Sequence, residues 1–300
     1  MAIDPHAKLK EFKPKHEFFV GIDSDGCAFD TMEIKHKECF IPNIINHWGL
    51  QAVSKYAREA AEFVNLYSRD RGVNRWPALV RVFDLLRERP EVQRRHSKIP
   101  EAPYLRKFIA SGVALGEPAL LHTIKETPDG PEKQELGKGY KWSRAVNDAI
   151  ADMVHGVPPF PFVRESLEKL CKKADIICVS ATPGEALVRE WEEHDIARYA
   201  AVIAGQEMGS KKEHLQYAAK GRYPKDHVLM IGDAEGDLKA ARPNDALFFP
   251  VNPGHEEASW ELFFNEAIER FFAGTYAGDY EKQLVDKFMT YLPQDPPWKK

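Results

Sequence analysis

Two aspartates stand where a short apolar run ends, and their position points to chemistry. The stretch 21–30 reads GIDSDGCAFD and follows the apolar run 18–20. Carboxylates are costly to crowd together and to remove from water. A turn would accept one of them, but Asp23 and Asp25 flank a serine and precede a glycine. The pair therefore indicates a site that uses carboxylate oxygens.

Other polar side chains follow two later apolar runs. Ser180 ends one run, and Asp233 follows another, with Asp237 a short distance further on. The pair Lys211-Lys212 precedes a helical pattern. In an open parallel sheet, the ligand crevice lies beyond the carboxyl ends of the strands. We therefore expect these segments to meet at one edge of a sheet.

The residue types match the requirements of phosphoryl transfer. Asp23, Asp25 and Asp233 supply oxygens of the kind that Mg²⁺ prefers. One aspartate can act as a nucleophile, and a second carboxylate can protonate a leaving oxygen and later activate water. The hydroxyl of Ser180 and the ammonium of Lys211 can hold phosphoryl oxygens as negative charge shifts.

Five short apolar runs, bounded by polar or turn residues, predict buried strands. They are 18–23, 175–180, 201–204, 228–232 and 246–251. Helical patterns lie between the last four of them. This alternation favours an α/β fold with a parallel sheet and crossover helices.

The stretch from 30 to 157 has apolar residues at helical spacing and no strand alternation. Within it, the polar segment 126–139 (ETPDGPEKQELGKG) predicts a loop. A stiff proline-rich linker, 155–161, leads back to the strand-rich part.

These patterns predict three parts. Residues 1–30 and 156–275 form the catalytic core, residues 31–155 form an inserted helical cap domain, and residues 276–300 form a C-terminal tail.

Four segments, in this order, resemble the motifs of the haloacid dehalogenase superfamily. They are VGIDSDGC (20–27) for a strand and D-x-D-G, IICVS (176–180) for a strand and a serine, Lys211 for the lysine that opens a helix, and VLMIGDAEGD (228–237) for a strand and G-D-x-x-x-D. Lys212 is the alternative lysine, and Lys211 is preferred because its spacing to Leu215 fits the family's helix. The resemblance implies a Rossmann-like parallel-sheet core with a large α-helical cap domain inserted after the first strand.

The resemblance also implies a role for each matched acid. Asp23 resembles the nucleophile, and Asp25 resembles the general acid/base, which also offers its backbone carbonyl to Mg²⁺. Metal binding would involve Asp23, Asp25 and Asp233. Asp237 resembles a supporting acid that orients metal waters or the lysine.

The remaining matched residues resemble phosphate holders: Ser180, the backbone amide of Ala181, and Lys211. Cys27 stands where the family more often has Thr or Val, and we expect it only to pack. Asp25 also separates branches of the family, because true dehalogenases lack this carboxylate. Its presence favours chemistry on phosphate esters.

A basic cluster in the predicted cap is a candidate for substrate selection. Arg71 and Arg75 lie in a polar loop between two helical patterns. Guanidinium groups suit phosphates and carboxylates. A solvated connection between helices would contain the same residues, so both interpretations stay open.

The residues and the resemblance predict a magnesium-dependent phosphatase that hydrolyses a small phosphomonoester through an aspartyl-phosphate intermediate. The alternatives are a sugar-phosphate mutase, a phosphonate hydrolase, or a catalytically silent binding relative, against which the intact set of acids argues. The expected partner is a small phosphorylated metabolite, and the expected state is a monomer or homodimer.

The composition sets further expectations. The 300 residues carry a formal net charge of −4, which argues against general nucleic-acid binding. There is no apolar signal core and no run near the roughly 20 apolar residues of a membrane span. The four cysteines lack metal or C-x-x-C spacing, so we expect reduced thiols. We therefore expect a soluble cytoplasmic protein with no nucleic-acid or membrane partner.

Overall fold

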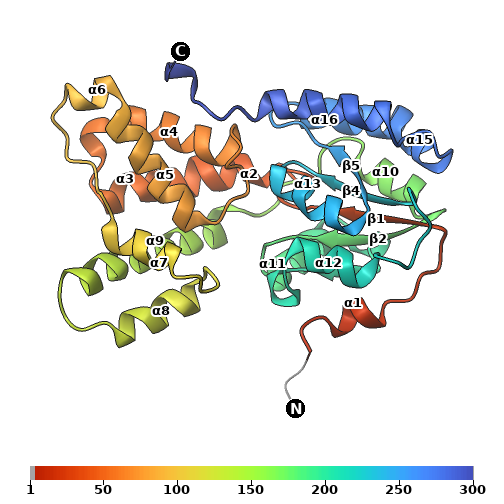
Figure 1. The fold of residues 1–300 in the computed structure, drawn as a ribbon, viewed down its shortest axis with the longest axis horizontal. Helices are drawn as coiled ribbons and strands as arrows, with labels where there is room; N and C mark the ends of the chain where they lie inside the picture. Colours follow the sequence, from red (N-terminus) through yellow and green to blue (C-terminus); the bar gives the residue numbers. More distant parts are fainter. Residues whose placement is uncertain (1–3, 300) are drawn as a thin grey trace. The chain divides into compact units, whose positions relative to one another are not determined.

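A computed structural model describes residues 4–299 of the chain, which form two compact units (Figure 1). The sheet unit contains the described residues up to Met32 together with Gly156–Pro293. The helical unit contains Glu33–His155 and the described residues from Gln294 onward.

The sheet unit is built on five parallel strands. They are β1 (Phe18–Ile22), β2 (Ala174–Val179), β3 (Val202–Ala204), β4 (Val228–Gly232) and β5 (Leu247–Pro250). Their order across the sheet is β3-β2-β1-β4-β5, and every neighbouring pair runs parallel. The predicted α/β fold with a parallel-sheet core is confirmed.

The strand order reverses at β1. The chain builds outward through β2 and β3 on one side and then returns to add β4 and β5 on the other. A reversal of this kind leaves a crevice beyond the carboxyl ends of the two central strands. Ile22 of β1 pairs with Ile231 of β4, so the residues that follow these strands emerge side by side.

Helices cover the sheet. They are α1 (Ala7–Glu11), α10 (Val163–Leu170), α11 (Gly184–Glu193), α12 (Lys211–Ala218), α13 (Glu235–Ala241), α14 (Glu256–Leu262), α15 (Ile268–Phe272) and α16 (Asp279–Tyr291). Val20 and Ile22 of β1 belong to one buried cluster, with apolar residues of α10 and α11. Phe19 belongs to a second cluster, with residues of α12 and α16. Burial on both faces explains why the strands are continuous apolar runs.

The helical unit has its own core. Its helices are α3 (Ile41–Trp48), α4 (Ser54–Leu66), α5 (Arg75–Glu88), α6 (Pro90–Gln93), α7 (Pro103–Ala110), α8 (Glu117–Glu126) and α9 (Pro131–Met153). The short helix α2 (Thr31–Ile34) lies at the boundary between the units. Residues 33–155 are all described and contain no strand, as the helical spacing predicts.

The predicted loop 126–139 is wrong over most of its length, because α9 begins at Pro131. Proline is compatible with the first turn of a helix, where its missing N–H is not needed. Leu136 is buried. A Cβ at Gly139 would lie 3.7 Å from Trp76, which is an ordinary packing distance, so this side of the helix faces Trp76. Contacts in the folded protein thus favour a helix where the proline and glycines of the sequence predict a loop.

The segment 276–300 is divided between the two units. Helix α16 packs on β5, and the Glu281 carboxylate accepts a hydrogen bond from the Phe248 amide at 2.7 Å. The last described residues belong to the helical unit. There, the Trp298 ring lies against Phe63 and under the guanidinium of Arg89, 4.5 Å away.

Across residues 4–299, none of the helices combines the length and the apolar character that crossing a membrane requires. The four cysteines are free, and Cys27, Cys39 and Cys178 are buried.

Candidate active site

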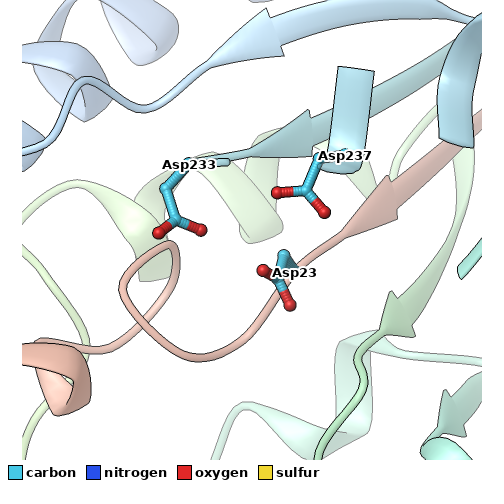
Figure 2. A group of neighbouring side chains, drawn as sticks. All are labelled: Asp23, Asp233 and Asp237. Atoms are coloured by element: carbon cyan, nitrogen blue, oxygen red, sulfur yellow. The ribbon is translucent and has the colours of Figure 1, made fainter. Parts of the chain in front are cut away.

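Three aspartates meet in one buried cluster at the carboxyl ends of the central strands (Figure 2). Asp23 follows β1, Asp233 follows β4, and Asp237 lies in the first turn of α13. One oxygen of each carboxylate lies within 4.8 Å of the others. The reversal of strand order therefore brings together acids that are far apart in the sequence.

The ammonium group of Lys211 belongs to the same cluster. Its Nζ donates hydrogen bonds of 2.7 Å to Asp23 Oδ2 and to Asp237 Oδ1. Lys211 is the first residue of α12, and Ser210 caps this helix in a capping box, which fixes where the helix begins. The adjacent Lys212 is exposed. Of the two lysines considered, the structure places Lys211 against the acids.

Burial dominates the electrostatics of the cluster. It raises the pKa of Asp23 well above its usual value, while Lys211 opposes this and the neighbouring acids reinforce it. Burial likewise raises the pKa of Asp237, against the pull of Lys211. Burial alone would lower the pKa of Lys211, but the surrounding carboxylates raise it well above the usual value. The lysine is therefore cationic at physiological pH.

The cluster fits a divalent cation. The cluster contains three carboxylates and one ammonium group, which contacts Asp23 and Asp237, so full ionisation leaves an excess of negative charge that a divalent ion would balance. Carboxylate oxygens are hard ligands, which suit Mg²⁺ better than soft metals. The donor set therefore agrees with the predicted metal.

A glycine makes room for one of the acids. A Cβ built on Gly232 would lie 2.4 Å from Cβ of Asp237 and 2.5 Å from its Oδ2. The same Oδ2 accepts a hydrogen bond from the Ala234 amide at 3.0 Å. Glycine at the end of β4 therefore has a steric reason, because the absence of a Cβ lets the first turn of α13 lie against the strand.

Asp25 is held by two threonines that the sequence did not single out. Thr31 donates to Asp25 Oδ1 at 2.5 Å, and Thr182 donates to Asp25 Oδ2 at 2.7 Å. Thr182 lies two residues after Ser180, so the second motif offered a signal for it. The only sequence signal for Thr31 was its position close to the first motif. Both hydroxyls fix the orientation of the Asp25 carboxylate.

Ser180 and Ala181 lie at the end of β2. Ser180 is buried, its amide donates to the Ala204 carbonyl, and its Oγ accepts from the Thr182 amide at 3.2 Å. Ala181 is exposed. A Cβ on Gly205 would lie 2.8 Å from the Thr182 carbonyl oxygen, so glycine allows β3 to approach this turn. Phosphate binding by Ser180 and Ala181 stays a prediction.

The two arginines considered for substrate selection each make hydrogen bonds within the helical unit. Arg71 is buried and donates to the Leu66 carbonyl at 2.9 Å. Arg75 donates to Ser143 Oγ at 2.7 Å and to Asn147 Oδ1 at 2.9 Å. These contacts lie within the helical unit, and a role of Arg71 and Arg75 in substrate selection stays a prediction.

No protein-family model matches the chain, and no curated protein matches it. Forty chains of solved structures do match. One is a haloacid dehalogenase-like family hydrolase from Streptococcus pneumoniae, with 13% identity, coverage of 90% of this chain and 98% of that chain, and a TM-score of 0.41. Another is a HAD-superfamily hydrolase, subfamily IA, from Geobacter sulfurreducens, with 14% identity, coverage of 79% and 88%, and a TM-score of 0.40. A predicted phosphoglycolate phosphatase from Haemophilus somnus has 14% identity, coverage of 79% and 86%, and a TM-score of 0.42.

Two of these structures carry the name of the family that the four motifs resemble. The identities and TM-scores are low, so no statement about the activity of this chain rests on them. The interpretation of the site rests on its own side chains.

Proposed function

We propose that this chain is a hydrolase of the haloacid dehalogenase superfamily that cleaves a small phosphomonoester with the help of Mg²⁺. One observation carries the proposal. The Lys211 ammonium, brought in by α12, lies 2.7 Å from Asp23 after β1 and 2.7 Å from Asp237 after β4, with Asp233 in the same buried cluster. Nucleophile, cation and metal ligands thus stand together, as phosphoryl transfer requires.

The metal would be held by Asp23, by Asp233 and by the backbone carbonyl of Asp25. When bound, Mg²⁺ would offset negative charge on the phosphoryl oxygens. The raised pKa values of Asp23 and Asp237 support this assignment, because a cation at the cluster would favour their ionised forms.

In the first step, an oxygen of Asp23 attacks phosphorus and the bond from phosphorus to the leaving oxygen breaks. Asp25 gives its proton to that oxygen, so an alcohol leaves and Asp23 carries the phosphoryl group. In the second step, Asp25 takes a proton from water, and the resulting hydroxide attacks phosphorus. Phosphate leaves and the Asp23 carboxylate is restored. Lys211 and Ser180 hold the phosphoryl oxygens during both steps.

Asp25 has to change partners during this cycle. In the structure both of its oxygens accept from threonines, Thr31 and Thr182. A hydrogen bond to a threonine hydroxyl can be exchanged for one to the leaving oxygen or to water. The two threonines therefore hold the acid/base in place between turnovers.

The helical unit is proposed to act as a cap over the reacting groups. A closed cap would exclude bulk water, which strengthens electrostatic interactions among the reacting groups. Such closure would favour a small phosphorylated metabolite as substrate.

The proposal is tested with an aryl phosphate and MgCl₂, comparing the wild type with Asp23→Asn. The wild type is expected to release phosphate, and the variant to lose activity by about a thousandfold or more, because an amide is a poor nucleophile. Equal rates would remove Asp23 from the mechanism. A panel of phosphate esters and phosphonates then identifies the substrate class, and a product isomerised without release of phosphate would indicate a mutase.

A further inference from the structure

Ser24, the residue between the two proposed catalytic acids, is held by two neighbouring residues of α11. The indole Nε1 of Trp191 donates to Ser24 Oγ at 3.0 Å. Ser24 Oγ in turn donates to Glu190 Oε2 at 3.1 Å. Ser24 and Trp191 are completely buried. A loop at the end of β1 is therefore attached to a helix that follows β2.

The directions of these two hydrogen bonds follow from the groups involved. An indole N–H can only donate, so Ser24 Oγ must accept from Trp191. The hydroxyl of Ser24 then donates its single hydrogen bond to Glu190, whose carboxylate is the acceptor. One hydroxyl thus links both residues and has a single favourable orientation.

The backbone of Ser24 is equally engaged. Its amide donates to Asp23 Oδ1 at 2.8 Å, so the position of Ser24 bears directly on the carboxylate that attacks phosphorus. Its carbonyl accepts from the amides of Ala28 and Phe29, at 2.9 and 3.0 Å. Movement of Ser24 would therefore move the oxygen of Asp23 that Lys211 does not hold.

We propose that Trp191 and Glu190 are positioning residues for the reaction and act through the hydroxyl of Ser24. Their function is to keep the Asp23 carboxylate aligned for attack while Asp25, the next residue along, changes partners. This inference rests on the proposed function for its catalytic consequence. The attachment of the loop is a separate statement that holds without it.

The segment that contains Thr182 and α11 contacts both Asp25 and Ser24. Thr182, just before α11, holds Asp25 through an exchangeable hydroxyl contact. Trp191, within α11, holds Ser24 in a dry environment, where a hydrogen bond is costly to break without replacement. Residues 182–191 therefore contact both the acid/base and the residue that precedes it.

The test compares Ser24→Ala and Trp191→Phe with the wild type. Each variant should lower kcat by about tenfold, less than the hundredfold that a displacement of about 1 Å costs, and leave KM nearly unchanged. Tyr276→Phe is the matched control. Its hydroxyl is also buried and donates to the Phe248 carbonyl at 2.8 Å, away from the acids. We expect this control to lower Tm by about 2–4 °C with kcat unchanged.

A double variant separates positioning from a general loss of stability. If Trp191 acts through the Ser24 hydroxyl, adding Trp191→Phe to Ser24→Ala should not lower kcat further. Multiplicative losses of kcat in the double variant would overturn the proposed route.

Hydrogen exchange gives a readout that does not depend on turnover. The amides of residues 27–29 should exchange faster in Ser24→Ala and in Trp191→Phe, and at the wild-type rate in Tyr276→Phe. Unchanged exchange and unchanged kcat would overturn the inference. If the wild type hydrolyses no phosphate ester, the proposed function fails, while the exchange measurement still decides whether α11 holds the loop.

Discussion

Lys211 and Lys212 are neighbours in the sequence, yet they lie in different environments. The Lys211 ammonium donates to two buried carboxylates, and Lys212 is exposed. Position at the start of a capped helix decides which side chain turns toward the strand ends.

This difference provides an internal control for the proposed mechanism. Lys211→Ala should lower kcat/KM by about a hundredfold or more, because it removes a cation that stabilises charge in the transition state. Lys212→Ala should stay within about twofold, as surface substitutions usually do. Steady-state kinetics with an aryl phosphate measures both. The reverse order of the two losses would show that the assignment of the lysine is wrong.

Gly232 allows a prediction about stability. Gly232→Ala should lower the free energy of unfolding by about 1–3 kcal/mol, because the new Cβ overlaps Asp237. Gly236→Ala is the control. It has no atom within 4 Å of a new Cβ and lies in α13, so it should stabilise by about 0.5–1 kcal/mol. Urea denaturation measures both changes, and an unaffected Gly232→Ala would contradict the steric argument.

At the scale of single elements, α12 carries a buried titratable group. His214 lies on its buried face, beside Leu215, and burial lowers the pKa of His214 to about 4. In the unfolded chain a histidine titrates near 6.5. Between these values the unfolded state binds a proton that the folded state does not, so stability falls as pH falls through this window.

The expected loss is at most about 3 kcal/mol between pH 7 and pH 4. His214→Gln removes this titration, so the difference in stability between wild type and variant should shift with pH in favour of the variant at low pH. Urea denaturation at several pH values measures the difference. A difference that stays constant with pH would show that His214 does not titrate in this way.

The strands were predictable and one helix boundary was not, for different physical reasons. A strand buried on both faces must be apolar along its whole length, which leaves a local signal, as in 228–232. The start of α9 was missed because Gly137 and Gly139 are local breakers and the proline of the first turn suggested a loop. The burial of Leu136 and Trp142, which favours the helix, depends on contacts with residues distant in sequence.

The candidate site divides in the same way. Its charged members stand at strand ends, where acids and lysine are conspicuous in the sequence. Two of the residues that orient them, Thr182 and Trp191, are ordinary in type and lie far in sequence from Asp25 and Ser24. These contacts form only when the sheet has assembled, so the sequence around Asp25 and Ser24 could not identify them. Thr31 is only six residues from Asp25, but its residue type did not distinguish it.

At the scale of the whole molecule, the site is a product of sheet assembly. Asp23 and Asp233 become neighbours because β1 and β4 pair in the middle of the sheet. Crowding these acids in the absence of a bound metal ion costs free energy of folding. Binding of a divalent ion to the folded state should therefore stabilise the entire chain.

We expect Tm to rise with MgCl₂ concentration in the wild type, and Asp233→Asn to lose most of this rise. Differential scanning fluorimetry measures Tm, and NaCl at equal ionic strength is the control for screening of charges by salt. Addition of EDTA should return Tm to the metal-free value and abolish phosphatase activity. An identical rise in wild type and variant would place the ion elsewhere.

The central claim is that Asp23 itself receives the phosphoryl group, and it can be observed directly. Asp25→Asn should slow hydrolysis of the acyl phosphate, so that the intermediate accumulates during turnover of an aryl phosphate. Quenching in acid, reduction with borohydride and peptide mapping should find homoserine in place of Asp23. If the wild type hydrolyses the ester but Asp25→Asn yields no homoserine, or yields it at an aspartate other than Asp23, the account is contradicted.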